Sequence, residues 1–166
     1  IRIDVIFPVL HGKNGEDGTI QGLFQLSGIP FVGCDTLASA VCMDKAVTNI
    51  LLEAAGIDQA NFMWFYASDY ENVKEQVKED IMADLGGYPV FVKPANAGSS
   101  VGVSKAKNAA ELDKAVAVAA KEDKKIVIEE CIVGKEVECA VMGNAIPKVS
   151  VVGEIAPSAE FYDYED

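Results

Sequence analysis

Short apolar runs of strand length alternate with a segment of helical periodicity at the start of the sequence, and this alternation limits the possible folds more than any other feature. Residues 3–7 and 29–33 are two such runs. Between them, apolar residues fall at helical spacing from Thr19 onward, and Gly28 offers a C-terminal stop. The order strand, loop, helix, strand predicts a parallel α/β sheet, whose ligands usually collect at the carboxyl ends of its strands.

Two further helices and an aromatic strand are predicted before residue 88. Asp44 is a good N-cap for the first of these helices, and residues 62–66 have the composition of a strand. Ser68 and Glu71 have the spacing of a capping box for the second helix. The side chains expected on the buried faces are Val47, Ile50, Leu51 and Ala54 in the first helix, and Val73, Val77 and Ile81 in the second.

The pattern changes at Pro89, and the second half of the chain predicts an antiparallel α+β unit. The expected elements are strands at residues 89–93 and 101–104 around a loop of small residues, a helix capped by Asn108 and Glu111, a strand at 126–128, and two strands between 137 and 152 that are joined across residues 143–144. The fold class expected for the chain is therefore α/β in its first part and α+β in its second.

Composition excludes several classes of protein. Half of the residues are hydrophobic and 24% are charged, as in a globular domain, and no apolar stretch approaches the roughly 18–20 residues that span a bilayer. The net charge of -12 argues against a nucleic acid as partner, because that binding needs cationic side chains that neutralise phosphates. No signal peptide or C-x-x-C pair is visible, so we expect a cytoplasmic protein whose cysteines are reduced: Cys34, Cys42, Cys131 and Cys139.

The strongest local signal is the segment Lys-Pro-Ala-Asn-Ala-Gly-Ser-Ser-Val-Gly at residues 93–102. A loop of Gly, Ser and Ala brings backbone N–H groups and hydroxyls close to an anion, because no bulky side chain intervenes. It is not a Walker A loop, since strands rather than a helix are expected on both of its sides. The alternative interpretation is an ordinary flexible hairpin tip.

Charged side chains next to this loop fit a nucleotide. Lys93 ends the strand at the base of the loop, and Lys45 opens a helix, where a nearby anion would compensate its unfavourable position in the macrodipole. Glu129 and Glu130 end a strand and Glu136 lies in the next loop, so that their carboxylates could accept hydrogen bonds from a ribose or an amino group. The alternatives are solvated surface lysines and an acidic surface loop.

His11 is the only histidine of the chain and lies where the first strand is expected to end. One histidine does not build a metal site without other ligands, and none is suitably spaced. The sequence also has no Ser-His-Asp, Cys-His or H-E-x-x-H pattern, so no hydrolase is indicated and no metal ligand is assigned within this chain.

Taken together, these segments resemble the D-alanine–D-alanine ligases of the ATP-grasp superfamily over essentially the whole chain. The segments that carry the resemblance are F-P-V-L-H-G-K-N-G-E-D-G-T-I-Q-G at residues 7–22, G-I-P-F-V-G at 28–33, L-A-S-A-V-C-M-D-K at 37–45, V-K-P-A-N-A-G-S-S-V-G at 92–102, I-E-E at 128–130, G-K-E-V at 134–137 and E-F-Y-D-Y-E at 160–165. The resemblance implies an enzyme that phosphorylates one D-alanine with ATP and joins the D-alanyl phosphate to a second D-alanine, for peptidoglycan and the bacterial cell wall.

The resemblance also implies roles for individual residues. On the nucleotide side it implies that Lys45 and Lys93 hold the ATP phosphates, that Ser99, Ser100 and Val101 belong to a mobile loop over them, that Glu129 contacts adenine beside the backbone of Glu130 and Cys131, and that Glu136 binds the ribose. On the D-alanine side it implies catalytic roles for Ser99, His11 and Glu16. Magnesium is implied as well, with its ligands in a C-terminal part beyond residue 166, and the family tends to form homodimers.

By the same resemblance, residues 1–43 end a parallel α/β N-terminal domain that precedes the ATP-grasp fold. Residues 44–131 then form the central ATP-grasp subdomain, and residues 132–166 begin the C-terminal subdomain. The chain starts with Ile1 rather than Met, so we expect an internal fragment. Because the resemblance places the magnesium ligands beyond residue 166, we expect the fragment to be inactive alone. Alternatives are a ligase that joins D-alanine to D-lactate or D-serine, and a non-catalytic ATP-binding module.

Overall fold

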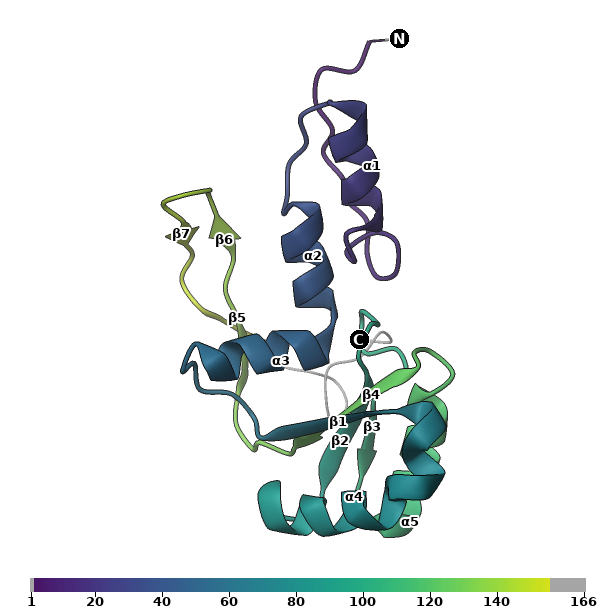
Figure 1. The fold of residues 1–166 in the computed structure, drawn as a ribbon. Helices are drawn as coiled ribbons and strands as arrows, with labels where there is room; N and C mark the ends of the chain where they lie inside the picture. Colours follow the sequence, from purple (N-terminus) through teal and green to yellow (C-terminus); the bar gives the residue numbers. More distant parts are fainter. Residues whose placement is uncertain (1, 156–166) are drawn as a thin grey trace. The chain divides into compact units, whose positions relative to one another are not determined.

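The computed structural model describes residues 2–155 of the chain. The chain forms two compact units, a first unit at Ile1–Cys131 and a second unit at Ile132–Asp166. Figure 1 labels the helices and strands of both units in chain order. The architecture is a mixture of α and β elements, as the sequence predicts. The segment at residues 160–165 that contributes to the family resemblance lies outside the described residues.

The parallel strands predicted near the N-terminus are reduced to a single bridge. Ile6 pairs with Phe31 in parallel, through hydrogen bonds of 2.9 Å from Ile6 N to Pro30 O and from Val32 N to Ile6 O. The intervening helix α1 spans Thr19–Ser27 and ends at Gly28 in the left-handed conformation, as predicted. The prediction of two full strands, at residues 3–7 and 29–33, was wrong. Ile3, Val5 and Phe7 are exposed, and among the described residues the pairing of this segment is the single bridge to Phe31.

Two short helices lead from this segment into the sheet. Helix α2 (Thr36–Met43) was not predicted; its N-cap Asp35 accepts a hydrogen bond of 2.8 Å from Ala38 N. Helix α3 (Lys45–Ala54) begins at Asp44, as predicted. Its expected buried stripe was wrong: the side chain that is buried is Ala46, whereas the two large apolar side chains, Ile50 and Leu51, are 42% and 49% exposed, and Ala54 is exposed as well.

A four-stranded antiparallel sheet forms the centre of the first unit, in the order β1-β4-β2-β3. Its strands are β1 (Phe62–Tyr66), β2 (Val90–Pro94), β3 (Ser104–Ala106) and β4 (Lys125–Glu130). The antiparallel unit therefore includes the aromatic strand β1, which precedes the change of pattern at Pro89. Strand β3 begins at Ser104 rather than at Val101, because residues 99–102 form turns.

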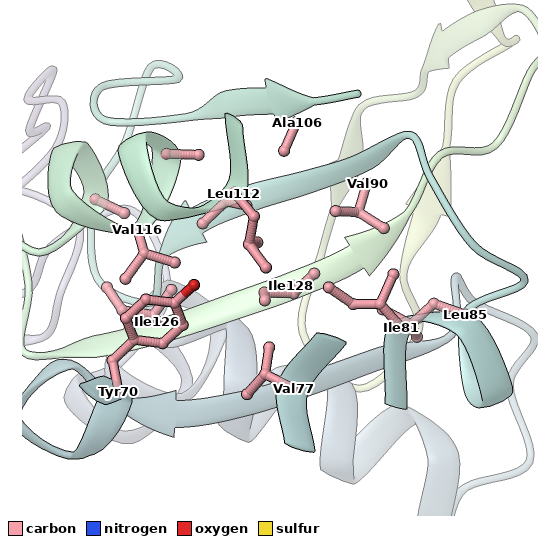
Figure 2. Close-up of a cluster of buried hydrophobic side chains, with 13 residues drawn as sticks. Tyr70, Val77, Ile81, Leu85, Val90, Ala106, Leu112, Val116, Ile126 and Ile128 are labelled. Carbon is pink, nitrogen blue, oxygen red and sulfur yellow. The ribbon is translucent and has the colours of Figure 1, made fainter. Parts of the chain in front are cut away.

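Helices α4 (Tyr70–Asp84) and α5 (Ala109–Ala119) cover one face of the sheet, which we call the core face. Figure 2 shows their side chains meeting those of β2 and β4, and Val90, Val92, Ile126 and Ile128 have no exposed surface. The inner face predicted for α4 is confirmed by the burial of Val77 and Ile81, and α5 buries Leu112 and Ala119 on the same side of the sheet. Removing this apolar surface from water supplies roughly 25 cal/mol per Å² and is the main stabilising contribution.

The two helix starts on the core face differ. Asn108 caps α5 as predicted, accepting from Ala110 N and Glu111 N. The capping box predicted for α4 was wrong, because a 3₁₀ turn (Ala67–Asp69) precedes the helix and its N-cap is Asp69, with no side-chain cap hydrogen bond. Ser68 instead donates a hydrogen bond of 3.0 Å to Asp69 Oδ1.

The second unit consists of two antiparallel pairs. Strand β5 (Glu136–Glu138) pairs with β8 (Gly153–Ile155), and β6 (Val141–Met142) pairs with β7 (Lys148–Val149). The hairpin predicted across residues 143–144 is confirmed by the β6–β7 pair. No helix among the described residues has both the length and the apolarity needed to cross a membrane.

Candidate functional site

The face of the sheet opposite the core face carries charged side chains on its central strands, and we call it the charged face. Side chains alternate between the two faces of a strand. On β2 the residues between the buried Val90, Val92 and Pro94 are Phe91 and Lys93, and on β4 Glu129 follows Ile128. The Lys93 ammonium forms an ion pair with Glu129 Oε2, and the two side chains are only 24% and 14% exposed.

Helix α3 supplies the other charged group of this cluster. Its first residue, Lys45, donates a hydrogen bond of 2.7 Å to Ala97 O, and Asn49 Nδ2 lies 3.2 Å from Glu129 Oε1. Residues four apart share one side of a helix, so Lys45 and Asn49 both face the sheet. The buried Ala46 packs with Ala95 and Val127 and holds this end of α3 against the charged face.

The electrostatics of the cluster favour an anionic ligand. Burial lowers the pKa of Lys45 below its ordinary value of 10.5, and the positive charge of Lys93 lowers it further, although Glu129 and Asp44 oppose this shift. The ammonium groups of Lys45 and Lys93 therefore repel each other, and the nearby carboxylates of Glu129 and Asp44 offset part of that repulsion. A phosphate group would relieve that repulsion, since an opposite charge nearby favours the charged form of lysine.

Residues 95–102 form a loop beside this cluster. Ser99 and Ser100 have left-handed backbone angles, with φ of 49° and 57°, and Val101 N donates to Gly98 O at 3.1 Å. The two residues form a tight turn of small side chains, and such turns can bring backbone N–H groups close to an anion. Ser99 and Val101 are exposed at the tip and Ser100 is half-buried.

The loop meets the turn that contains His11 and Glu16. A Cβ atom added to Gly98 would lie 3.1 Å from Gly12 Cα and 3.6 Å from Glu16 Oε2. Glu16 in turn accepts a hydrogen bond of 2.5 Å from Gly12 N. His11 is exposed in the same turn, and within residues 2–155 its side chain forms no hydrogen bond or ion pair. The structure thus brings Glu16 to the loop, whereas it gives the imidazole no partner.

Glu16 also lines a cavity of about 390 Å³ in the first unit. Its wall includes Gln21 of α1, Ser39 of α2 and the two cysteines Cys34 and Cys42. Gln21 is 8% exposed, and its side-chain amide donates a hydrogen bond of 2.9 Å to Gly15 O. This bond holds the turn that contains His11 and Glu16 against helix α1. The cavity offers a volume suited to a small polar molecule next to the Gly98–Gly12 contact.

The remaining predicted residues lie outside the ion-pair cluster. The Glu130 carboxylate accepts a hydrogen bond of 2.7 Å from Asn61 N and so fixes the start of β1. Cys131 follows β4 and is half-buried. Glu136 begins β5 in the second unit and is exposed. No group of three or more His, Cys, Asp or Glu side chains that could hold a metal ion occurs within the described residues.

The structure adds three polar side chains that the sequence did not indicate. Asn49 contacts Glu129, Lys125 pairs with Asp44 at 2.5 Å, and Asn96 donates to Asp123 Oδ2 at 2.8 Å. Asn49 could have been found from its spacing of four residues from Lys45. The other two contacts join segments that are far apart in the sequence, and no local pattern indicates them.

Comparison with known proteins gives two family matches. Residues 51–166 match the model described as D-ala D-ala ligase C-terminus. Residues 1–34 match the model described as D-ala D-ala ligase N-terminus. Together the two matches cover both units and most of the sequence, with a gap across α2 and the start of α3.

Individual proteins agree with these matches. The chain is 58% identical over 168 residues to a D-alanine–D-alanine ligase of Acetivibrio thermocellus, covering 99% of this chain and 43% of that enzyme. Among solved structures, the VanG D-Ala:D-Ser ligase from Enterococcus faecalis matches with a TM-score of 0.87 and 48% identity, over 99% of this chain and 46% of that one. The D-alanine-D-alanine ligase from Coxiella burnetii matches with a TM-score of 0.84 and 38% identity, over 93% and 45%. The chain therefore spans less than half the length of these relatives.

Proposed function

Because the chain belongs to the D-alanine–D-alanine ligase family, we propose that the complete gene product uses ATP to join two molecules of D-alanine. The observation that carries the proposal is the convergence of Lys45, Lys93 and the loop at residues 95–102 beside one face of the sheet. Two partly buried ammonium groups next to a turn of small residues suit the phosphates of a nucleotide. Residues elsewhere in the complete gene product would supply the rest of the site.

On the nucleotide side, Lys45 and Lys93 are the proposed phosphate ligands. Lys93 is paired with Glu129 in the structure, and in the proposal a phosphate would take the place of that carboxylate as its partner. Glu129 is then free to accept a hydrogen bond from the adenine amino group, beside the backbone of Glu130 and Cys131. By the family resemblance alone, Glu136 is the proposed ribose ligand.

The chemistry is transfer of the γ-phosphoryl group to a D-alanine carboxylate, which releases ADP. The amine of the second D-alanine then attacks the resulting acylphosphate and displaces phosphate, which forms the amide bond. Positioned cations contribute most of the stabilisation in phosphoryl transfer. The loop with Ser99, Ser100 and Val101 would cover the phosphates and exclude water, which otherwise hydrolyses the acylphosphate. Magnesium would neutralise phosphate charge, with ligands that we place outside residues 2–155.

On the D-alanine side, Ser99, His11 and Glu16 are the proposed substrate residues. Support comes from the contact of Gly98 with Gly12 and from the cavity that Glu16 lines. A closed loop then places Ser99 next to the turn that carries His11. Substrate held between the two segments would be oriented by both, which lowers the entropic cost of reaction.

The proposal extends to the setting of the enzyme. Residues 1–43 would end the N-terminal α/β domain, residues 44–131 would form the central ATP-grasp subdomain, and residues 132–166 would begin the C-terminal one. The enzyme would act in the bacterial cytoplasm as a homodimer and supply the dipeptide for peptidoglycan. Sedimentation of the complete gene product tests the dimer, since a monomer at micromolar concentration contradicts it.

The test of the function is release of phosphate and ADP by the complete gene product with ATP, magnesium and D-alanine. We expect D-alanine-dependent release, with D-alanyl-D-alanine identified by mass spectrometry. A Lys45→Met and Lys93→Met double variant is the matched control, since it removes both proposed phosphate ligands. Release that this double variant retains in full would contradict the assigned site.

A D-alanine–D-serine ligase is the second candidate, and one observation favours it. A solved D-Ala:D-Ser ligase matches the chain at 48% identity with a TM-score of 0.87. Adding D-serine, and in a separate arm D-lactate, to the same assay decides between acceptors. Release with D-alanine alone supports the first candidate, whereas release only after D-serine or D-lactate is added supports a ligase for that acceptor. Nucleotide binding without release in any arm would indicate a non-catalytic module.

A further inference from the structure

The side chain of Asp44 joins three segments that are distant in the sequence. Its Oδ1 atom caps α3 by accepting hydrogen bonds of 3.1 Å from Ala46 N and from Val47 N. Its Oδ2 atom accepts a hydrogen bond of 2.5 Å from Lys125 Nζ, at the start of β4, and is 3.4 Å from Asn96 Nδ2 in the loop after β2. One carboxylate therefore contacts the helix, the sheet and the loop.

The backbone at this junction is joined in the same way. Lys45 N donates to Ala95 O at 3.0 Å, and Ala95 N donates to Lys125 O at 2.9 Å. Asn96 N donates to Asp123 Oδ2 at 2.8 Å, which fixes the next residue of the loop. The first residue of α3, the first residues of the loop and the start of β4 consequently have little freedom to move relative to one another.

Helix α2 provides an internal comparison, because it too begins at an aspartate. Among the described residues, the hydrogen bond that the Asp35 side chain makes is the cap to Ala38 N, and Asp35 is exposed. Capping therefore does not require a cationic partner or burial. The Asp44 and Lys125 side chains are 14% and 17% exposed, and an ion pair with so little solvent is expensive to form unless its geometry is constrained.

The charge of Asp44 is maintained by these contacts. Burial alone would raise its pKa, but hydrogen bonds from Lys125 and from Val47 N hold the pKa below its ordinary value of 3.8. Asp44 is thus a carboxylate at neutral pH, and it precedes Lys45 directly in the chain. Any displacement of Asp44 moves the Lys45 backbone and with it the ammonium that contacts Ala97 O.

We propose that Asp44 is a positioning residue of the ATP site, which fixes Lys45 and the base of the loop at residues 95–102 to strand β4 through its pair with Lys125. This inference rests on the proposed function, in which Lys45 is a phosphate ligand. Asp44 does not touch the nucleotide in this proposal. It sets where the ammonium of Lys45 lies relative to that of Lys93.

The test compares Asp44→Asn with Asp35→Asn in the complete gene product. Asparagine keeps an oxygen that can accept the cap hydrogen bonds at both sites, so only the charge-dependent contacts to Lys125 are weakened, and only at position 44. We expect the KM for ATP to rise by about tenfold in Asp44→Asn, since small displacements of catalytic groups have large kinetic effects. The KM for D-alanine should stay within about twofold in both variants, and Asp35→Asn should behave as wild type.

Variants of Lys125 test the same ion pair without changing Asp44, in case the Asp44→Asn protein does not fold. Lys125→Gln removes the other member of the pair and leaves Asp44 to cap α3, so the same rise in the KM for ATP is expected. Lys125→Arg keeps a cation and should restore most of the wild-type KM. If Asp44→Asn does not fold, the Lys125 variants decide the question on the same readout.

The outcomes separate the inference from the proposed function. Absence of D-alanine-dependent phosphate release by the wild type contradicts the proposed function. An active wild type whose KM for ATP is unchanged in Asp44→Asn and in Lys125→Gln overturns the positioning role. Equal rises in the KM values for ATP and D-alanine would also overturn it, because they indicate a general structural defect rather than displacement of a phosphate ligand.

Discussion

The two faces of the central sheet are built from the same strands and have opposite properties. On the core face, Val90, Val92, Ile126 and Ile128 are fully buried under α4 and α5. On the charged face, the intervening residues include Lys93 and Glu129, which are partly exposed and paired with each other. Successive side chains of a strand point to opposite faces of the sheet. Residues that stabilise the core and residues of the candidate site can therefore be neighbours in one strand.

The register of the sheet connects the two sets of residues. Strands β2 and β4 pair Phe91 with Glu129 and Lys93 with Val127. Lys93 and Glu129 are therefore diagonal neighbours on one face, within reach of long side chains. A slip of one residue would turn Ile128 toward the charged face and Glu129 toward the apolar core, at a large cost in free energy. Burial on the core face thereby fixes the ion pair on the other face.

The largest effect should come from the core face. Ile128→Ala removes fully buried apolar volume under α4 and α5, and we expect the free energy of unfolding to fall by about 2–5 kcal/mol. Denaturant unfolding of the complete gene product measures this loss, and the folded fraction should keep its KM for ATP. A large rise in that KM with unchanged stability would show that the two faces are not separable.

The next effect should come from the charged face. Lys93→Met removes a proposed phosphate ligand, and we expect kcat/KM for ATP to fall by about 10²–10³-fold, which corresponds to roughly 2.7–4 kcal/mol of lost transition-state stabilisation. The free energy of unfolding should also fall, by up to about 3–5 kcal/mol, because the Glu129 carboxylate loses its partner in a largely buried pair. Initial-rate kinetics and thermal unfolding of the same samples check both values. Wild-type kinetics in this variant would remove Lys93 from the site.

A third prediction concerns pH. The pKa of Lys45 is lowered in the folded chain by burial and by Lys93, so the folded state holds this proton less tightly than the unfolded state. Keeping Lys45 protonated in the folded state lowers the free energy of unfolding. This loss is complete at a pH below the pKa of the folded state, and it disappears as the pH rises from that pKa to the ordinary value of 10.5. Bound phosphate requires the protonated amine, so the KM for ATP should rise by up to about tenfold per pH unit above the folded pKa.

The control for the pH prediction is Lys45→Met, which has no amine to titrate at this position. Its KM for ATP should be high and should lose the alkaline rise that the wild type shows. Initial rates from pH 7 to 10 at saturating D-alanine give both profiles. Parallel profiles in the two proteins would assign the titration to another group.

The smallest effect should mark the boundary of the site on the charged face. Tyr66 lies at the far end of β1, is 42% exposed, and contacts Trp64 edge-on with 5.7 Å between ring centroids. Tyr66→Phe keeps the ring, so the free energy of unfolding should stay within about 0.5 kcal/mol of wild type, and the KM for ATP within about twofold. A clear change in the KM would extend the site along β1.

Local patterns in the sequence predicted most of the elements of the first unit. The Asp44 and Asn108 caps, the Gly28 stop and the existence of strands β2 and β4 each depend on residues close in the chain. The start of α4 was wrong because the 3₁₀ turn displaced Ser68 from the N-cap position. The prediction of the buried stripe of α3 was wrong because the residue of this helix that is buried against the sheet is Ala46, whereas Ile50 and Leu51 are exposed.

The candidate site could be predicted in part for the same reason. The lysines and the loop were identified individually, but no local rule pairs Lys93 with Glu129 or Asp44 with Lys125, which are 36 and 81 residues apart. Those contacts depend on strand order and register, which the pattern of one chain does not determine. The assignment of roles to His11, Ser99 and Glu136 remains a prediction from resemblance.

The approach of Gly98 to Gly12 has a consequence for the timing of catalysis. Two glycines meet without side chains, so the contact consists of a few dispersion interactions of about 0.1–0.2 kcal/mol each. Such a contact contributes little free energy to holding the tip of the loop in place. If the loop covers the phosphates as we propose, the ligand beneath it would supply most of that free energy, and the time for which the loop stays closed would depend on whether the site is occupied.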